Sequence, residues 1–315
     1  MKKLPVIIDT DPGIDDAVAI LLALASPEFD VLGITAVAGN VPLERTVTNA
    51  LTVRRYAKAE QVPVYAGATR PLLRQPAYAV CHGHDGLGGY GESTAMAGIE
   101  CEDAVSFLIR IFREAAQGKR EKITLCPLAP LTNIALALSQ APDIISGIER
   151  IVLMGGAFCE PGNVTPAAEF NIYTDPHAAR IVFSCGVPLV FLPLDVTHKT
   201  LVTAARLDAL QKVGNKAADF AAKLLANCKE NPVRFAGKGI PLHDPTVFGW
   251  LLHPEYFTAR PAYVEVECES ELCMGYTLAD FYGKKGKPFN AQVVTDLNAD
   301  AFFADLTARL HVYDD

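Results

Sequence analysis

Apolar residues along this chain occur in short runs that alternate with stretches of helical spacing. The first run, Val6 to Ile8, ends in a polar turn, and apolar side chains then return at Ala17, Ile20 and Leu24, a spacing typical of one helix face. Further runs predict strands at residues 31–38, 63–65, 122–126, 150–154 and 189–194. Helices are predicted between them at residues 42–58, 103–116 and 175–184, with another beginning at residue 134. This alternation favours a mostly parallel sheet with right-handed crossovers.

The last third of the chain is more polar but keeps the same kind of pattern. Residues 203–235 predict helices packed beside the sheet, and residues 247–252 predict a short apolar helix. Strands at residues 262–267 and 291–295 and a final helix from residue 299 complete the prediction. No repeat or linker interrupts the chain. We therefore expect residues 1–315 to form one α/β domain, with an open, mostly parallel sheet flanked by helices.

Composition limits the possible partners more than it changes this fold. Half of the 315 residues are apolar and a fifth are charged, which allows a sizeable core, and the net charge of −8 argues against nucleic acid as the main partner. The eight cysteines are scattered without a Cys-x-x-Cys pair, so neither a thiolate zinc site nor a disulfide framework is expected. The first apolar run is too short for a signal peptide or a membrane span, so we expect a cytoplasmic protein without a membrane partner.

Four carboxylates follow the first predicted strand within eight residues: Asp9, Asp11, Asp15 and Asp16. We expect Asp9 and Asp11 at the carboxyl end of the strand and the other two in the first turn of the helix. Acidic side chains suit the helix dipole there, but that explains only one or two of them. Holding like charges together beside a buried strand is costly unless a cation lies among them. Oxygen ligands of this kind suit a hard cation.

Other interpretations of this stretch remain open. A helix cap with solvated turn acids requires no ligand. An apolar strand followed by Asp-x-Asp can also serve aspartyl phosphoryl transfer, although the lysine and later acidic pair of that chemistry are not evident downstream. A nucleoside- or ribose-binding module without catalysis is a third possibility.

Polar residues later in the chain fall where strands are predicted to end. Asn40 follows the second strand, where a capping or turn role is the plainer alternative. A Gly-rich loop at residues 81–90 carries His82 and His84 and is expected to be a mobile surface flap over a pocket. The amides and acid of the loop after residue 155 suit sugar hydroxyl groups; they are Asn163, Glu169 and Asn171. The pair His243–Asp244 precedes a proline, where a capping Asp beside a surface His is the plainer alternative.

Taken together, five segments resemble the inosine–uridine preferring nucleoside hydrolases over essentially the whole chain, most closely the bacterial ribonucleoside hydrolases of broad purine and pyrimidine range. The segments are Asp9-Thr10-Asp11-Pro12-Gly13-Ile14-Asp15-Asp16-Ala17, Ala38-Gly39-Asn40, Met154-Gly155-Gly156, Ala168-Glu169-Phe170-Asn171 and His243-Asp244. The resemblance implies a nucleoside hydrolase-like sheet and a homodimer or homotetramer. His84 stands where relatives often have an acidic residue, so the loop leaves the base preference open.

The same resemblance implies a tightly held Ca2+ and a role for each site residue. Its ligands would be Asp11, Asp16, Asp244 and the backbone carbonyl of Leu128. The ribose would be held by Asp15, Asn40, Asn163, Glu169 and Asn171, with Met154 against it. Asp15 and Asp16 are adjacent on a helix and point about 100° apart, which fits one role on the metal and another on the sugar.

The implied reaction is hydrolysis of the N-glycosidic bond of a ribonucleoside, through a transition state that resembles an oxocarbenium ion. Asp11 is expected to take the proton of the attacking water. His243 is expected to protonate the departing base, because its ordinary pKa lies near neutrality. His82 on the flap is a second candidate for gripping or protonating the base.

Overall fold

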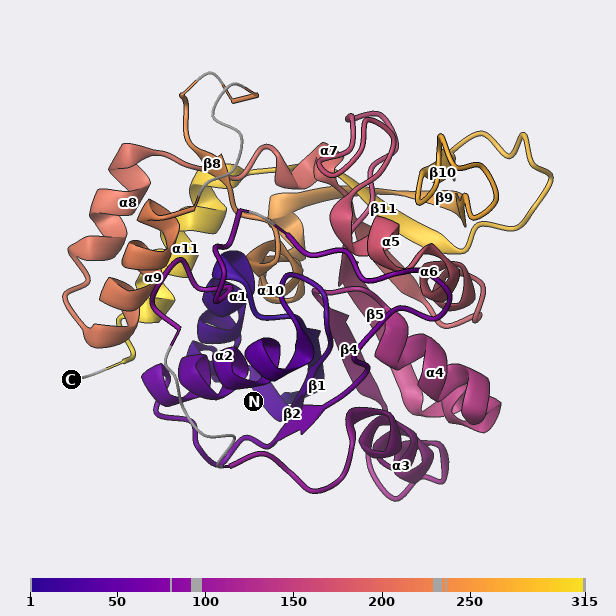
Figure 1. The fold of residues 1–315 in the computed structure, drawn as a ribbon, viewed down its shortest axis with the longest axis horizontal. Helices are drawn as coiled ribbons and strands as arrows, with labels where there is room; N and C mark the ends of the chain where they lie inside the picture. The colour runs from indigo at the N-terminus through magenta and orange to yellow at the C-terminus, as the bar shows by residue number, and fades with distance from the viewer. Residues whose placement is uncertain (1, 80, 92–97, 229–233, 236, 314–315) are drawn as a thin grey trace.

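The computed structural model describes residues 2–79, 81–91, 98–228, 234–235 and 237–313. Nine strands form one sheet in the order β10-β9-β11-β6-β5-β4-β1-β2-β3 (Figure 1). Their bounds are β1 Leu4–Thr10, β2 Phe29–Ala36, β3 Val64–Ala66, β4 Ile123–Pro127, β5 Ile148–Met154, β6 Leu189–Leu192, β9 Phe257–Val266, β10 Thr277–Asp280 and β11 Ala291–Leu297. β7 (Leu201–Val202) and β8 (Ile240–Pro241) form a separate antiparallel pair.

Most of the sheet is parallel. From β3 through β11 each neighbouring pair of strands runs in the same direction, and only β9 and β10 are antiparallel to their neighbours. β1 lies between β2 and β4 and is buried over its last five residues, as a central strand must be. In such a sheet the carboxyl ends of strands share one edge, where ligands bind.

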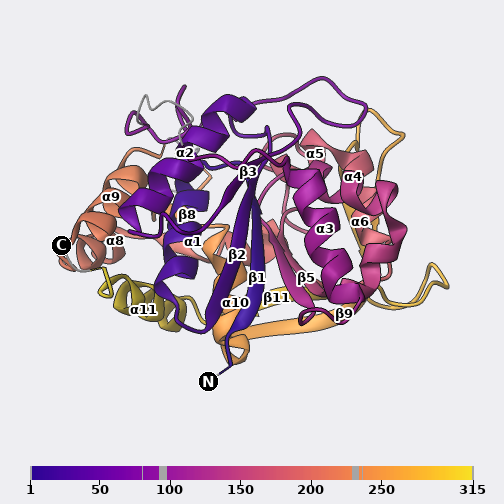
Figure 2. The ribbon, with the colours of Figure 1, turned by 90° about the horizontal axis from the view of Figure 1, so that it is seen from below.

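Helices cover both faces of the sheet. Their bounds are α1 Ile14–Ala25, α2 Leu43–Tyr56, α3 Ala104–Ala116, α4 Thr132–Gln140, α5 Phe170–Thr174, α6 Pro176–Phe183, α7 Leu194–Thr197, α8 Ala204–Gln211, α9 Lys216–Ala226, α10 Pro245–Leu252 and α11 Ala299–Leu310, with short 3-10 turns η1 (Pro142–Gly147) and η2 (Pro254–Tyr256). Figure 2 shows α1, α8, α9 and α11 on one side of the strands and α3, α4 and α6 on the other. Two apolar clusters correspond to these two layers, one around α1 and α9 and one around α3 and α4. The predicted α/β class, with a mostly parallel sheet flanked by helices, is confirmed.

Two predicted boundaries are wrong. The strand predicted at residues 189–194 ends at Leu192, and Leu194 already belongs to α7. Pro193 has no N–H to continue the ladder, and it lies at the start of that helix. The helical stretch predicted to Phe235 ends at Ala226; Phe235 lies in a turn, and residues 229–233 lie outside the described residues. None of the described helices has the length and apolar character needed to cross a membrane.

Candidate active site

The first strand, turn and helix place the acidic residues as the sequence predicted. Asp9 lies within β1, Asp11 directly follows it, and α1 begins at Ile14 after the Pro12-Gly13 turn. The Asp16 carboxylate accepts a hydrogen bond from the Gly13 N–H (2.9 Å), which caps the start of α1. Its other oxygen accepts from the Thr10 hydroxyl at 2.5 Å. The turn is therefore built around a buried carboxylate.

Asn40 ties the end of β2 to this turn. Its backbone N–H donates to Asp11 Oδ2 at 2.6 Å, and its side-chain amide donates to the Asp11 carbonyl and to Asp16 Oδ2, both at 3.1 Å. Gly39 is needed next to it, because a Cβ there would lie 2.0 Å from Asp11 Oδ2. Asn40 thus fixes two of the acidic groups as well as lining the cavity beside them.

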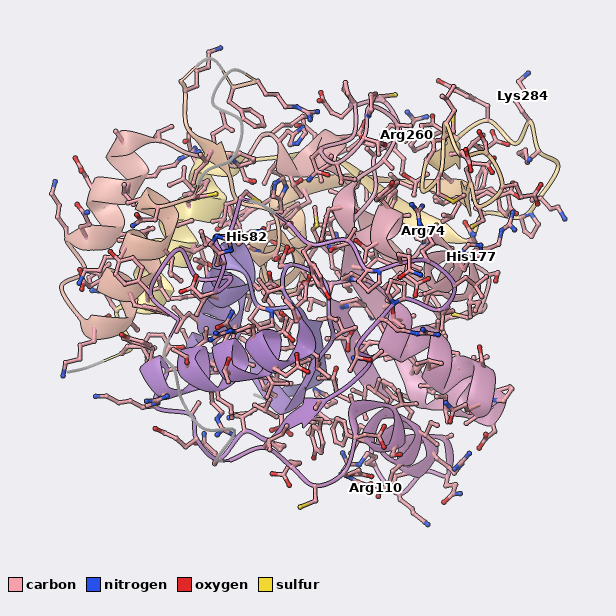
Figure 3. The ribbon with its side chains drawn as sticks, viewed as in Figure 1. Arg74, His82, Arg110, His177, Arg260 and Lys284 are labelled. Atoms are coloured by element: carbon pink, nitrogen blue, oxygen red, sulfur yellow. The ribbon has the colours of Figure 1, made fainter. Side chains whose placement is uncertain are left out.

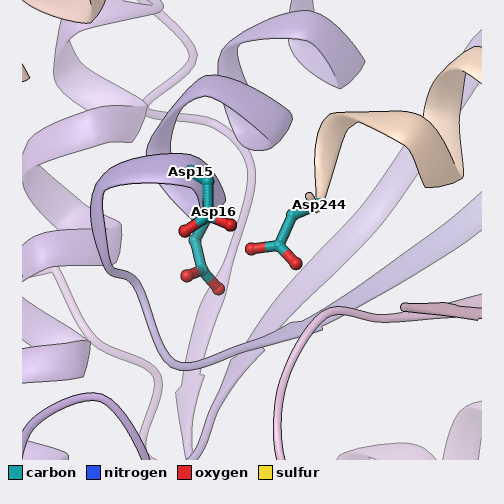
Figure 4. Close-up of side chains that lie close together, drawn as sticks. All are labelled: Asp15, Asp16 and Asp244. Atoms are coloured by element: carbon teal, nitrogen blue, oxygen red, sulfur yellow. The ribbon is translucent and has the colours of Figure 1, made fainter. Parts of the chain in front are cut away.

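Asp244 joins the acidic turn from a distant part of the chain. It lies at the start of α10, and Figure 4 shows its carboxylate directed toward those of Asp15 and Asp16 at the start of α1. Carboxylate oxygens of Asp15, Asp16 and Asp244 all lie within 4.8 Å of one another. Among the described residues this trio contains Asp15, which the resemblance assigned to the sugar, and it does not contain Asp11. Asp11 is nevertheless close enough for its charge to act on Asp244.

Burial and mutual repulsion raise the pKa values of these acids. Burial raises the pKa of Asp11 well above its usual 3.8, and the charge of Asp16 adds to the effect. Burial also raises the pKa of Asp244 well above that value, with further contributions from the charges of Asp15, Asp16 and Asp11. The pKa of Asp16 is raised in the same direction. The cluster therefore carries a repulsive energy that a cation would remove.

The donor set fits a hard cation. Asp11 Oδ1 is buried without a hydrogen-bond partner among the described residues, although carboxylate oxygens in such surroundings are normally paired. Leu128 lines the cavity, and its carbonyl accepts from the Asn171 side chain at 2.9 Å, which leaves the second lone pair of that oxygen for another partner. All these ligands are oxygens, which select Ca2+ or Mg2+ over softer metals. The acidic cluster could thus bind a metal ion.

We expect the metal-free protein to lose stability as the pH rises. An acid whose folded pKa is above its unfolded value of 3.8 stabilises the fold below that value, and the contribution is lost as the pH rises through the folded pKa. Burial raises the pKa of Asp9 from 3.8 to about 7, so the stability that protonated Asp9 contributes is lost as the pH rises from 3.8 to about 7. The chelated protein should therefore melt at a lower temperature at about pH 8 than at about pH 5, and added Ca2+ should reverse the trend. Scanning calorimetry with and without chelator measures this; a melting temperature that rises with pH in the chelated protein contradicts it.

Asp9 supports the turn without lining the cavity. Asp9 Oδ1 accepts from the Thr35 hydroxyl (2.6 Å) and from the Asn133 side chain (2.8 Å). Asn133 also donates to the Ala36 carbonyl and accepts from the Ala68 N–H. These contacts join the ends of β1 and β2 to the segment after β3, so Asp9 has a structural role.

A cavity of about 580 Å³ opens beside the acidic cluster. Its wall includes most of the residues predicted for the site: Asp15, Asn40, His82, Leu128, Met154, Asn163, Glu169, Asn171, His243 and Asp244. Asp11 and Asp16 are not part of the wall; both are fully buried behind it. The sequence prediction thus identified residues that the fold brings to one place.

The residues expected to hold a sugar are themselves held firmly. The Glu169 carboxylate caps α5 by accepting from the N–H groups of Asn171 (2.9 Å) and Ile172 (3.2 Å), and it also accepts from the Gly156 N–H at 2.7 Å. Burial raises the pKa of Glu169. Asn163 Oδ1 accepts from the Phe170 N–H at 2.9 Å. These bonds fix both side chains at the cavity wall.

The two candidate histidines approach the cavity from different segments. His243 Nδ1 lies 2.7 Å from the Thr197 hydroxyl, and its ring meets that of His198 edge-on. His82 Nδ1 accepts from the Ile14 N–H at 3.1 Å, which places the loop against the start of α1. Figure 3 shows His82 next to that end of α1.

Several residues that shape the cavity were not predicted from the sequence. Asp195 in α7 accepts from the N–H groups of Phe158, Cys159 and Glu160 and thereby orders the loop after β5. Thr197 in the same helix holds His243. The cavity wall also includes aromatic and apolar side chains that no local pattern distinguishes from core residues: Tyr78, Phe170, Leu225 and Phe235.

Comparisons with known proteins agree with this geometry. The family described as inosine-uridine preferring nucleoside hydrolase matches residues 6–304. The pyrimidine-specific ribonucleoside hydrolase RihA of Salmonella gallinarum is 42% identical over 313 residues, covering 98% of this chain and 99% of that protein. Among solved structures, the plant nucleoside hydrolase PpNRh1 matches with a TM-score of 0.90 at 32% identity, covering 98% of this chain and 99% of that one. The purine-preferring ribonucleoside hydrolase from Gardnerella vaginalis matches with a TM-score of 0.88 at 32% identity, covering 98% of each chain. The chain is thus a hydrolase of N-glycosyl compounds and belongs to the inosine-uridine preferring nucleoside hydrolase family.

Proposed function

We propose that this protein is a Ca2+-dependent ribonucleoside hydrolase that releases ribose and a free purine or pyrimidine base. One observation carries the proposal: Asp15, Asp16 and Asp244 converge beside Asp11 at a cavity whose wall also includes His243. The relatives are named for pyrimidine in one case and purine in another, so we propose a range that includes either class.

We propose that the cation is held by Asp11, Asp16, Asp244 and the Leu128 carbonyl. When bound, Ca2+ would supply a lowered pKa for an attached water and a fixed position for the sugar diol. Oxygen ligands in number, together with diol oxygens, favour Ca2+ over the smaller Mg2+.

Asp11 is the proposed general base. Asp9 and Asp11 each have a buried carboxylate oxygen that no described residue pairs, but only Asp11 is bound to Asn40 at the cavity and acts by its charge on Asp244. Asp15, Asn40, Asn163, Glu169 and Asn171 would hold the ribose hydroxyls, with Met154 against the ring. Positive charge that develops on the ribose is stabilised by the surrounding carboxylates, Asp15 and Glu169 among them.

His243 is the proposed acid that protonates the departing base. Thr197 contacts Nδ1 of this ring, and His243 is part of the cavity wall, where a base would lie. His82 is the second candidate, for contact with the base rather than for the chemical step. We further propose one domain over residues 1–315, a homodimer or homotetramer, and a cytoplasmic role in nucleoside catabolism.

A nucleoside panel assayed for reducing sugar, with and without chelator, tests the proposal. Inosine, uridine, cytidine, adenosine and xanthosine are each offered to the enzyme, and the 2′-deoxy forms are included because loss of a diol oxygen should make them poor substrates. Sugar release that stops with chelator and returns with Ca2+ supports the proposal. Phosphate release from nucleotides without base release from nucleosides would indicate the phosphatase alternative. Tight nucleoside binding by calorimetry without turnover would indicate a binding module.

A further inference from the structure

The His82 loop is folded onto the protein body. We call residues 81–91 the flap. Its centre is organised by the Asp85 carboxylate, which accepts from the N–H groups of Leu87 (3.1 Å), Gly89 (3.0 Å) and Gly91 (2.8 Å). Leu87 is fully buried, and the Gly88 N–H donates to the His82 carbonyl at 2.9 Å. His84 and Tyr90 are exposed, as a surface loop predicts, while the centre of the loop closes on itself and packs inward.

Asn49 joins the flap to the acidic turn. It lies in α2, is 1% exposed and is not part of the cavity wall. Its side-chain nitrogen donates one hydrogen bond to the Pro12 carbonyl at 2.9 Å and another to the Asp85 carbonyl at 2.8 Å. A side-chain amide has two hydrogens to donate, and these two bonds use both. A single buried group thus binds the flap and the turn that carries the acids.

Gly86 lets the flap approach this closely. Its φ is +83°, and a Cβ there would lie 2.7 Å from the Asn49 Nδ2 and 3.2 Å from the Pro12 carbonyl oxygen. Gly89 in the same flap also has a positive φ, +95°, but a Cβ there would meet nothing within 4 Å. The two glycines therefore share the backbone strain of a substitution and differ in the contacts of a new Cβ, which at Gly86 would be with Asn49, Val41 and the Pro12 carbonyl.

We propose that Asn49 is a positioning residue that holds the flap closed, so that His82 is in place over the cavity when substrate arrives. It acts through backbone carbonyls, without touching substrate. Breaking its two hydrogen bonds lowers the fraction of molecules with a closed flap. If substrate binds only the closed form, part of its binding energy is used to close the flap. KM then rises by the inverse of the closed fraction, while kcat is retained.

Two substitutions of Asn49 test the proposal against a matched control. Asn49→Leu removes both donors, and Asn49→Asp puts a carboxylate against two carbonyls. We expect KM for the best nucleoside to rise about 10- to 100-fold, as the loss of two buried hydrogen bonds allows, with kcat within about threefold. Asn290 is the control, because its side-chain nitrogen also donates to two carbonyls, those of Phe183 and Val264 (both 2.9 Å), beside the amino end of β11. Asn290→Leu should leave KM unchanged; an equal KM for the Asn49 and Asn290 variants overturns the proposal.

A glycine pair gives a second test that leaves Asn49 intact. Gly86→Ala should force the flap from Asn49 and raise KM, whereas Gly89→Ala should not. Equal effects of the two alanines would assign the change to backbone strain and contradict the proposed role of Asn49.

Hydrogen–deuterium exchange of peptides covering residues 81–91 provides a readout that needs no catalysis. Exchange in Asn49→Leu and Gly86→Ala should be about tenfold faster or more than in wild type, and unchanged in Asn290→Leu and Gly89→Ala. The kinetic part rests on the proposed function, and exchange separates the two. Faster flap exchange in the variants of a protein that hydrolyses no nucleoside would refute the proposed function and support the role of Asn49. Unchanged exchange in the variants of an active enzyme would refute the role of Asn49 alone.

Discussion

Replacing Asp11 by Asn should lower kcat for nucleoside hydrolysis by about 10³-fold or more. General-base catalysis typically contributes ~10²–10⁴-fold, and Asp11 is also a proposed ligand of the cation, so the two losses combine. The substitution keeps the shape of the side chain, and its oxygen can still accept the Asn40 N–H that now reaches Asp11 Oδ2 at 2.6 Å. The loss would therefore reflect chemistry rather than folding. Steady-state assays of ribose release at saturating Ca2+ measure it.

A neighbouring acid provides the control. Asp9→Asn removes a buried carboxylate from the same strand end, but the new amide oxygen can still accept from Thr35 and Asn133, so activity should fall less than about tenfold. Asp11→Asn should also raise the melting temperature of the metal-free protein, because it removes one of several repelling buried charges. Near-wild-type turnover of Asp11→Asn would rule out the proposed base.

Replacing His243 by Ala should cost ~10²–10⁴-fold in kcat on nucleosides, the usual contribution of general acid catalysis. The loss should depend on the leaving group. A 4-nitrophenyl riboside releases a stable anion that needs no proton, so the variant should hydrolyse it at close to the wild-type rate. The ratio of the two rates, measured for both enzymes, isolates the protonation step.

His177 offers the comparison for this variant. It lies in α6 and is not part of the cavity wall, so His177→Ala should leave both rates unchanged. If His243→Ala slows hydrolysis of the riboside as much as hydrolysis of the nucleosides, His243 does not act as the acid and instead supports the structure of the site. If His82→Ala instead slows hydrolysis of nucleosides but not of the riboside, His82 is the acid.

The sequence determined the elements because their signals are local. Apolar runs and helical spacing predicted most strands and helices within a few residues, since burial on one or both faces dictates those periods. Elements with weak local signals were missed. α5 begins in a loop rich in polar residues, and β10 is a four-residue strand defined by its pairing with β9. Where Pro193 interrupts an apolar run, the pattern alone overextended the strand.

The acidic character of the site could also be predicted from the sequence, because four acids within eight residues are more than a helix start requires. What the sequence could not supply was the surroundings of each acid. That Asp15, Asp16 and Asp244 meet, that Asp11 is buried behind the cavity wall, and that Asn49 reaches both Pro12 and Asp85 are consequences of long-range packing. Residues far apart in the chain meet only when parallel strands end at one edge of a sheet, and single-residue patterns carry no information about that meeting. The residue types were therefore set by the sequence, and their partners and pKa values only by the tertiary structure.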